Sequence, residues 1–401
     1  MSTEPDPTAR SALIERDARP GGRKVRRIVI GLVALLVVLY AGIGWYVSGE
    51  MIDGFVSLRY QVEYDTDVIS VSTDEITLDV TDAEYADANA DAIMGLRWDG
   101  GYGRVGPSID SDGGVQTRPF ERITGELPPT GADVIDFDSF VFRDDPSVIG
   151  VDFENVTYPS ELGDLEAWFV PGTGSTWIVG VHGVGSERPE FLRLLNEISD
   201  LDYPMLMVTY RNDADAPSTD GSLVLFGKDE WRDVQAAVDY ALAKGAEDVV
   251  LAAPSMGAAL SLAYTLETDA TAVRGLILEA PAADFREIVR LRSGEALPIG
   301  GVIGDSFLAA GRLFTRLRTG LDFDTIDYID RADSLTVPIL LFHGRADERI
   351  PFAIGEALAR ARPDLVEFHP IDDGAHVMAW NEDPDAYGRI VREFLNRIGR
   401  S

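Results

Sequence analysis

One stretch near the N-terminus is apolar without interruption. Residues 28–47 read IVIGLVALLVVLYAGIGWYV, twenty positions without a charged side chain. An α-helix of that length covers about 30 Å, the thickness of the hydrocarbon core of a bilayer. Basic residues precede the stretch and amphipathic aromatic residues end it, as is typical of membrane spans: Arg23, Lys24, Arg26, Arg27, Trp45 and Tyr46. The pattern predicts a transmembrane helix over residues 28–48.

The charges beside this stretch also predict its orientation. Basic flanks stay in the cytoplasm, so residues 1–27 are expected to form a disordered cytoplasmic tail, with the rest of the chain outside. A cleaved signal peptide is the alternative. Its apolar core would be shorter, about 7–15 residues, and a small-residue cleavage site would follow. Residues 47–51 read VSGEM and offer no such site. We therefore favour an uncleaved signal anchor in the cell membrane.

Residues 49–150 show a different rhythm, in which apolar and polar positions alternate. Residues 68–71 read VISV and residues 75–80 read EITLDV, which is typical of half-buried strands. The alternation predicts a β-rich, membrane-proximal extension over residues 49–150.

From residue 151 onward, near-continuous apolar runs alternate with helical patterns. Such runs indicate strands covered on both faces, as in parallel sheets, and strand–helix alternation predicts a doubly wound α/β sheet. Residues 151–401 are therefore expected to form one α/β domain with a mostly parallel sheet. The expected strands cover residues 177–181, 205–209, 249–253, 275–279 and 338–342.

Composition narrows the possible functions. The 401-residue chain carries a net charge of −33 and has no cysteine. An acidic surface repels phosphate backbones, so no nucleic-acid partner is expected. The absence of cysteine excludes disulfides, a cysteine nucleophile and thiolate metal sites. No residue pattern calls for a cofactor or a metal.

One expected strand leads directly into a serine. Residues 249–259 read VVLAAPSMGAA, in which Ser255 lies between a strand and a helix start, with small Ala253 and Gly257 two residues away on either side. A nucleophile on a sharp strand-to-helix turn exposes its hydroxyl above the sheet. The first helical turn also offers the Met256 N–H to a developing oxyanion. As a pattern alone, a serine at this place is more often a helix cap.

Two later segments complete a catalytic pattern. Asp347 lies in HGRADERIP just past an expected strand, and His376 lies in DGAH, one of only four histidines in the chain. Ser, Asp and His follow in the chain order used by serine hydrolases with this alternation. Asp372 and Asp373 are weaker candidates for the acid because the histidine occupies their loop. The spacing predicts Ser255 as nucleophile, His376 as base and Asp347 as its orienting acid.

A glycine-bearing turn after the first strong strand fits the same site. Residues 181–185 read VHGVG, and such a turn offers a second backbone N–H to an oxyanion, which we assign to Val184. His182 and Gly183 are possible pocket residues, as are Pro254 and Arg211. His182 and His343 are more often structural hydrogen-bonding residues at such strand ends, and His369 is expected in a strand or at the surface.

Residues 151–399 resemble the α/β-hydrolase superfamily, in the branch of membrane-associated esterases and lipases and of serine peptidases. The motifs HGVG, APSMG, HGRADERIP and DGAH carry the resemblance. It implies the triad Ser255, Asp347 and His376 with Val184 and Met256 as oxyanion donors. Residues 285–334 interrupt the strand pattern with apolar helical pieces, 302–307 and 313–317 among them. In this fold such an insertion usually caps the site, and plain surface helices are the alternative. Ala253 and Pro254 depart from the family, which mostly has glycine and often an aromatic residue there.

Three functions remain open at this stage. An esterase or lipase acting on a carboxylic ester fits the membrane tether and the apolar insertion. A peptidase or amidase would use the same triad. A non-catalytic anchored binding protein would retain the fold alone, which the full set of triad residues disfavours.

Overall fold

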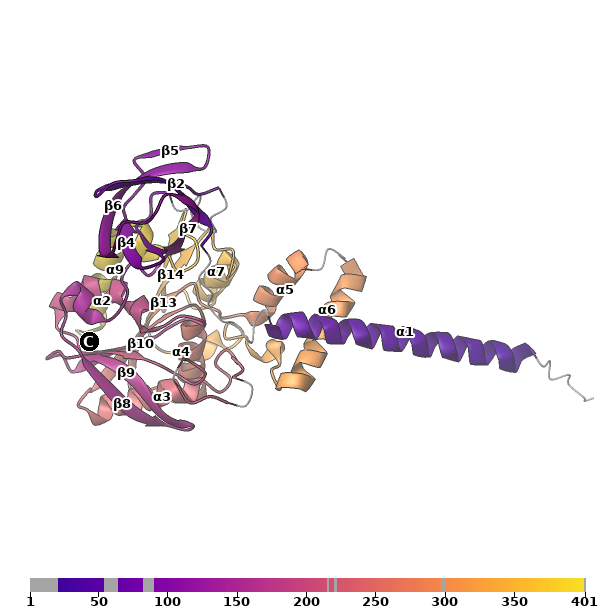
Figure 1. Cartoon of the computed structure of the whole chain (residues 1–401). Coiled ribbons are helices and arrows are strands. Elements are labelled where there is room, and N and C mark those ends of the chain that lie inside the picture. Colours follow the sequence, from indigo (N-terminus) through magenta and orange to yellow (C-terminus); the bar gives the residue numbers. More distant parts are fainter. Residues whose placement is uncertain are drawn as a thin grey trace, which may run out of the picture.

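The computed structural model describes residues 21–53, 64–81, 90–214, 216–219, 222–296 and 301–399. Figure 1 shows three parts: a long N-terminal helix, an antiparallel barrel, and a larger α/β unit that joins them. Residues 1–20, most of the predicted tail, lie outside the described residues.

The long N-terminal helix, α1, covers Gly21–Met51. It therefore begins before the predicted span and includes residues 21–27, which the sequence analysis assigned to the tail. Arginine and lysine are good helix formers, so the basic flank continues the helix. By length and composition α1 can cross a membrane, and only 6% of its most apolar window is buried. The C-terminal end of α1 is buried instead, because Val47, Met51 and the following residue Ile52 lie in the main apolar core.

The described strands between Thr66 and Asp138 form the barrel, within the segment predicted to be β-rich. Its strands are β1 (Thr66–Val71), β2 (Glu75–Asp79), β3 (Met94–Trp98), β4 (Gly101–Val105), β5 (Asp110–Asp112), β6 (Val115–Gly125) and β7 (Gly131–Asp138). They lie in the order β2-β1-β7-β3-β4-β6-β5, and an additional pairing of β2 with β6 closes the ring. The long β6 makes closure possible, because its first half pairs with β2 and its second half with β4.

The larger unit is built on an eight-stranded sheet. Its strands are β8 (Glu154–Ser160), β9 (Gly163–Val170), β10 (Thr176–Val181), β11 (Met205–Val208), β12 (Asp248–Pro254), β13 (Val273–Glu279), β14 (Ile339–Gly344) and β15 (Val366–Ile371). The spatial order is β15-β14-β13-β12-β10-β11-β9-β8. Neighbouring strands from β11 to β15 are parallel, whereas β9 is antiparallel to β8 and β11. The sheet is thus mixed. The predicted parallel pairing holds for the strands from β15 to β11, and β9 departs from it.

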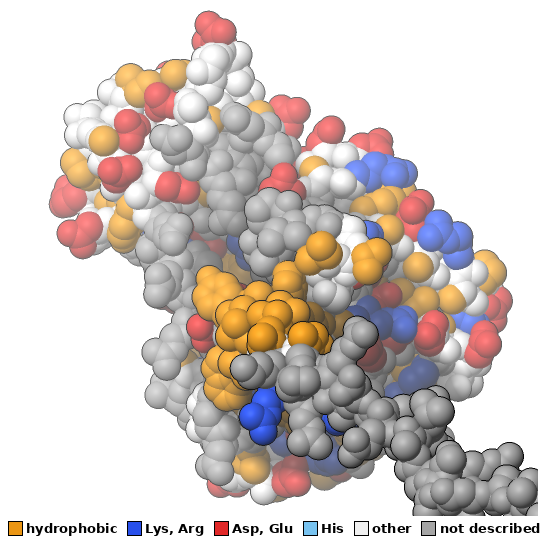
Figure 2. Space-filling view, turned by 90° about the vertical axis from the view of Figure 1, so that its right-hand side faces the viewer, with side chains coloured by type: hydrophobic (Ala, Val, Ile, Leu, Met, Phe, Trp, Pro, Cys, Tyr) orange, Lys and Arg blue, Asp and Glu red, His pale blue; other side chains and the backbone are white. Residues whose placement is uncertain are grey.

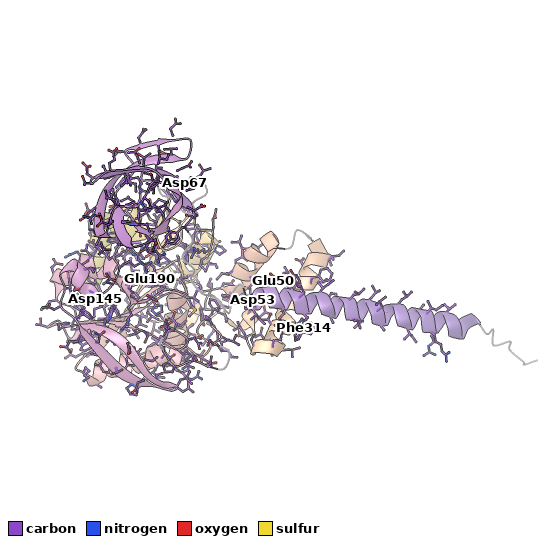
Figure 3. All side chains as sticks on the ribbon, viewed as in Figure 1. Glu50, Asp53, Asp67, Asp145, Glu190 and Phe314 are labelled. Atoms are coloured by element: carbon purple, nitrogen blue, oxygen red, sulfur yellow. The ribbon has the colours of Figure 1, made fainter. Side chains whose placement is uncertain are left out.

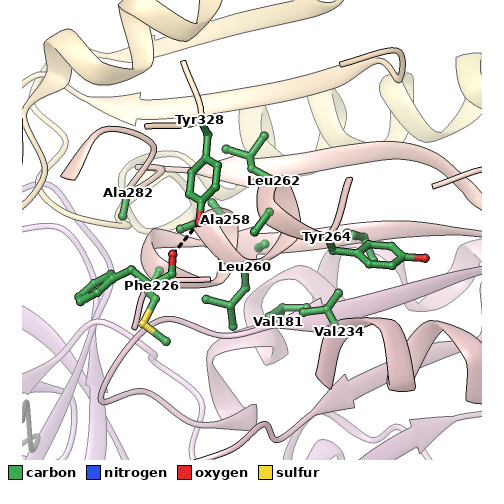
Figure 4. Packing of buried hydrophobic residues seen from close by; sticks show 14 of the residues in the cluster. Val181, Phe226, Val234, Ala258, Leu260, Leu262, Tyr264, Ala282 and Tyr328 are labelled. Atoms are coloured by element: carbon green, nitrogen blue, oxygen red, sulfur yellow. Dashed lines mark hydrogen bonds between the residues drawn. The ribbon is translucent and has the colours of Figure 1, made fainter. Parts of the chain in front are cut away.

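Helices cover both faces of this sheet. The helices are α2 (Leu192–Ile198), α3 (Trp231–Ala243), α4 (Ser255–Glu267), α7 (Phe352–Ala361), α8 (Ala379–Glu382) and α9 (Pro384–Ile398). Residues of α3, α4 and α7 share one apolar cluster with the sheet, and α2 and α9 share another on the opposite face. Helix α4 is buried from Ser255 through Thr265, as expected for a helix that is apolar on all sides. Figure 4 shows Leu260 and Leu262 in this packing.

Between β13 and β14 lies the helical insertion, residues 285–334. It contains α5 (Phe285–Ala296) and α6 (Gly301–Thr319), followed by 3₁₀ turns at Phe323–Thr325 and Ala332–Ser334. The two apolar pieces recognised in the sequence, 302–307 and 313–317, belong to the single helix α6. In Figure 1 the insertion lies where α1 enters the globular part. Tyr328 secures its base by donating a 2.7 Å hydrogen bond to the Phe226 carbonyl (Figure 4).

Candidate active site

Ser255 occupies a strained turn at the carboxyl end of β12. Pro254 ends the strand in an extended conformation, and Ser255 begins α4 with a φ of 52°, a left-handed value that is uncommon for a residue with a side chain. The small neighbours are needed for this turn. A Cβ on Gly257 would lie 1.8 Å from the Val181 carbonyl oxygen, and one on Gly183 would lie 3.2 Å from the Ser255 Cβ. The sequence A-x-S-x-G thus matches the space available.

Three side chains from separate loops form one hydrogen-bonded row. His376 Nε2 lies 3.0 Å from Ser255 Oγ, and His376 Nδ1 lies 2.8 Å from Asp347 Oδ2. Asp347 follows β14 and His376 follows β15, so all three lie beyond the carboxyl ends of parallel strands. Since Asp347 accepts at Nδ1, the imidazole carries a proton there and presents Nε2 to the hydroxyl.

The environment of Asp347 keeps its carboxyl group ionised. Burial alone would raise the pKa of Asp347, but His376 and hydrogen bonds from His343, His376 and the Ile350 N–H outweigh it and hold the pKa well below its ordinary value. The other carboxylate oxygen accepts from the Arg349 and Ile350 N–H groups at 2.9 and 2.8 Å. A carboxylate with this many donors is a fixed anion beside the imidazole.

His343 also contacts the Asp347 carboxylate. The His343 side chain is fully buried. Its Nε2 lies 3.1 Å from the Ile350 carbonyl oxygen and 3.4 Å from Asp347 Oδ2. Because a carbonyl only accepts, Nε2 carries the proton. Gly355 leaves room for the ring, since a Cβ there would lie 2.4 Å from His343 Nδ1. These contacts fit the structural role that the sequence analysis favoured.

The turn that begins at His182 is held by buried polar contacts. His182 Nδ1 lies 2.9 Å from the Gly183 carbonyl oxygen and Nε2 lies 3.0 Å from Asp213 Oδ2. Both ring nitrogens thus face acceptors. Burial opposes protonation, but the Asp213 carboxylate outweighs it and raises the pKa of His182. Tyr210 stacks on the ring and donates to the His182 and Gly183 carbonyls at 3.1 Å.

Glu190 fixes the same turn from the other side. Its carboxylate accepts the Gly183 N–H at 2.9 Å and the Ser186 hydroxyl at 2.8 Å. No hydrogen bond from the Val184 N–H is found among the described residues. Met256 lies in the first turn of α4, where an α-helix leaves its N–H groups without intrahelical partners. Of the predicted oxyanion donors, Met256 directly follows Ser255 in the chain, and Val184 follows Gly183, on which a Cβ would lie 3.2 Å from the Ser255 Cβ.

Arg211, a possible pocket residue, has other partners. It is buried, and its guanidinium forms ion pairs with Asp233 at 2.6 Å and with Glu161 at 3.1 Å. These contacts join the end of β11 to α3 and favour a structural role over contact with substrate. Pro254 lines a cavity behind the Ser255 turn of about 30 Å³, together with Glu190, Arg193 and Glu279. That volume suits a water molecule and is too small for a substrate.

The loop that carries His376 is anchored to the barrel, a contact that no sequence motif predicts. Asn381 is fully buried and donates to the Ile93 and Ser139 carbonyls at 2.7 and 2.8 Å, both at ends of barrel strands. Its own carbonyl accepts the Ile93 N–H at 2.8 Å. Arg193 donates to the Asn381 side chain and, at 2.9 Å, to the Val377 carbonyl, next to His376.

Apolar contacts reinforce this connection. Ala375 and Met378, on either side of His376, are buried in the apolar cluster of the barrel. The local sequence does not mark Asn381, because its barrel partners Ile93 and Ser139 lie 288 and 242 residues away.

By sequence, the chain has distant relatives. No family model matches the chain. It is 24% identical over 251 residues to the uncharacterized protein YqkD of Bacillus subtilis, covering 61% of this chain and 79% of that protein. It is also 24% identical over 268 residues to the uncharacterized protein YfhR of Escherichia coli K12, covering 64% and 84%.

Among solved structures, an esterase of Pyrococcus furiosus superimposes with a TM-score of 0.52 and 18% identity, over 64% of this chain and 94% of that one. At this identity the likeness concerns the fold. Together with the strand order and the serine turn after β12, it identifies the larger unit as an α/β-hydrolase fold.

Proposed function

We propose that the chain is a membrane-anchored serine hydrolase that cleaves a carboxylic ester. The observation that carries the proposal is the row Ser255–His376–Asp347, with 3.0 and 2.8 Å between its polar atoms. A buried, ionised acid, an imidazole of defined tautomer and a hydroxyl on a strained turn are the three parts that nucleophilic acyl transfer needs.

The proposed reaction has two halves. The Ser255 oxygen attacks the ester carbonyl while His376 Nε2 takes its proton, and the carbonyl electron pair moves onto the oxygen. The Val184 and Met256 N–H groups stabilise that oxyanion, and each such donor is typically worth about 2.7–4 kcal/mol of barrier. The intermediate then collapses, the alkoxide leaves with the proton from His376, and an acyl-serine remains. Water, deprotonated by the same imidazole, releases the acid and restores Ser255.

Asp347 stays ionised throughout this cycle. It holds His376 in the productive tautomer and stabilises the imidazolium that forms in each half-reaction. The depressed pKa of Asp347 supports this role because a protonated acid would offer a donor where an acceptor is needed.

The apolar helix α1 supports a membrane location. We assign residues 1–27 to the cytoplasm and the barrel and hydrolase unit to the outside, from the basic residues that precede the span. The helical insertion, with its apolar α6, favours an ester with an acyl chain or another apolar substituent.

Activity-based labelling tests the proposal. Membranes that contain the full chain are treated with a fluorophosphonate probe, with Ser255→Ala as the test variant. Ser261→Ala is the matched control, since Ser261 is a buried serine on the same helix. We expect labelling of the wild type and the control alone. Labelling that survives Ser255→Ala would contradict the assignment.

Substrate class and topology need separate measurements. p-Nitrophenyl esters of graded chain length are compared with peptide anilides, and turnover of the anilides alone would replace the esterase assignment with a peptidase. Protease added to intact cells is expected to digest the chain after residue 50, and full protection would reverse the proposed orientation.

A further inference from the structure

Helix α6 of the insertion lies directly against α1. The Tyr40 hydroxyl donates to the Ser306 carbonyl at 2.5 Å, and the Ser48 and Thr315 hydroxyls are 3.1 Å apart. Because residues 40 and 48 of one helix meet 306 and 315 of the other in the same order, the two helices run in the same direction. Helix α6 therefore accompanies the last turns of the apolar span. Figure 3 shows Phe314 beside this end of α1, where Glu50 is labelled.

Small residues bring the two helices close together. A Cβ on Gly44 would lie 2.8 Å from the Ala310 Cβ, and one on Gly311 would lie 2.4 Å from a Val47 methyl group. In contrast, a Cβ on Gly42 would meet nothing within 4 Å. Small residues at the contact are typical of helices that associate within membranes.

The contact ends in an aromatic and cationic group. The Trp45 and Phe314 rings meet edge-on with centroids 6.0 Å apart, and the Arg318 guanidinium lies 4.5 Å over the Trp45 ring. Tryptophan and arginine in this position are typical of the membrane–water boundary.

Helix α6 exposes an apolar face that continues the surface of α1. The exposed fractions of Val302, Ile303, Leu313 and Leu317 are 85, 62, 55 and 70%. The neighbouring Leu36 to Val38 of α1 are exposed by 61–67%. Figure 2 shows a contiguous hydrophobic patch on the side of the molecule from which α1 projects. A patch that combines several large aliphatic side chains is costly in water and marks a contact with another apolar phase.

Charged residues limit how deeply α6 enters that phase. Arg312 and Arg316 lie on the same helix and form ion pairs with Asp324 and Asp322 at 3.0 and 2.8 Å. Long arginine side chains reach the headgroup region while the helix body lies among acyl chains. The pattern is that of a helix packed on the outer part of α1, with its aliphatic face among the acyl chains.

We propose that α6 is a second membrane contact, seated in the outer leaflet against α1, so that the helical insertion is fixed to the bilayer. The occupant of its apolar face is the acyl-chain region of the lipids. This inference rests on the proposed membrane location of α1. It narrows the substrate class to esters that reach the site from the membrane surface, because the insertion holds the proposed hydrolase unit against the lipid boundary.

Single cysteines test the proposal cleanly, because the chain contains none. Val302→Cys, Leu313→Cys and Leu317→Cys are each labelled with an environment-sensitive nitrobenzoxadiazole dye in the full chain. The labelled proteins are reconstituted in phosphatidylcholine–phosphatidylglycerol vesicles, at about one copy per vesicle, with or without brominated lipids. Val37→Cys on α1 is the lipid reference, and Leu162→Cys, which is 41% exposed between β8 and β9, is the water reference. Each variant must first label with the fluorophosphonate probe, which shows that it is folded.

We expect brominated lipid to quench the three α6 positions several-fold more than Leu162, with Val302 above Leu317 because Ser306 lies level with Tyr40. Quenching of Val37 with no quenching on α6 would overturn the inference and leave the anchor intact. No quenching at Val37 would refute the anchor, and the inference with it. Protection of α6 from both brominated lipid and aqueous iodide would mean that protein covers this face, for example a second copy, and would also overturn it.

Discussion

The barrel and the helical insertion are held in place in different ways. The barrel is joined by buried polar contacts, centred on Asn381, and by Met378 in its apolar cluster. The insertion is joined to α1 by small residues and leaves aliphatic side chains such as Leu313 exposed.

Buried hydrogen bonds are directional and costly to leave unmade, whereas packing of small and aliphatic groups tolerates displacement more readily. We therefore expect the barrel to set the position of His376, and we propose that the insertion controls access from the apolar side. Four substitutions test this division.

The largest effect on kcat is expected for Asp347→Asn. An amide in place of the carboxylate favours the wrong tautomer of His376, and we expect kcat to fall by about 10⁴-fold with little change in KM. Steady-state hydrolysis of a short p-nitrophenyl ester measures the effect. A loss below tenfold would mean that another group orients His376, and the barrel side would then need a different explanation.

The same variant makes a prediction about acid stability. The folded chain depresses the pKa of Asp347, so this carboxylate contributes stability that is complete above its ordinary pKa of about 4 and is lost as the pH falls below it. Denaturant unfolding between pH 5 and pH 2.5 should therefore show a steeper loss for the wild type than for Asp347→Asn. Parallel curves would contradict the assignment of the depressed pKa.

Asn381→Ala breaks the barrel side. It leaves the Ile93 and Ser139 carbonyls and Arg193 without this partner, and we expect about 2–4 kcal/mol lower stability and a kcat reduced by roughly 10–100-fold. Asn396→Ala is the matched control, since Asn396 bonds only within an exposed stretch of α9. An Asn381→Ala enzyme with lower stability and wild-type kcat would show that the barrel stabilises the unit without positioning His376.

Gly44→Val breaks the insertion side. The added methyl groups collide with Ala310 and Phe314, so we expect α6 to shift on α1 and KM for long-chain esters to rise several-fold, with short-chain turnover unchanged. Gly42→Val is the control on the same helix, where space is open. An equal loss for short and long chains would contradict a role in access.

The smallest effect, a change in stability, is expected for Glu382→Gln at the junction of the barrel and the larger α/β unit. Burial, then Asp373 and Asp91, raise the pKa of Glu382 to about 7, so its folded form favours protonation and stability falls as the pH rises from about 4.5 to 7. We expect the variant to gain roughly 1 kcal/mol over the wild type at pH 8 and nothing at pH 4, allowing for partial exposure. Thermal unfolding at both pH values measures it.

The elements predicted from sequence were those with local signals. Apolar runs such as 249–253 correspond to the central strands of the sheet, because burial on both faces leaves a continuous pattern. Strands β8, β9 and β15 were missed. Strands β8 and β15 are the edge strands of the sheet, and β9 contains charged Asp164 and Glu166. Barrel closure was also beyond reach, because it depends on the pairing of β2 with β6 and not on either strand alone.

The candidate site likewise contains residues that the sequence marks and residues that it does not mark. The order of Ser255, Asp347 and His376 and the small residues around Ser255 are visible in the chain, and the structure brings these three side chains together. The supports of the turn at Gly183 and of the His376 loop, Glu190 and Asn381, carry no local signature. Their function arises from partners that only the fold places beside them.

The end of α1 has a mechanical consequence. Val47, Met51 and Ile52 are embedded in the enzyme's own core, so the joint to the anchor is stiff, whereas a flexible ten-residue leash would sweep about 16–19 Å. With α1 in a bilayer, the proposed active site would be held at one height and one tilt above the lipid plane. Encounters would then be a two-dimensional search, governed by lateral diffusion and by the surface density of the ester in the leaflet rather than its concentration in the medium.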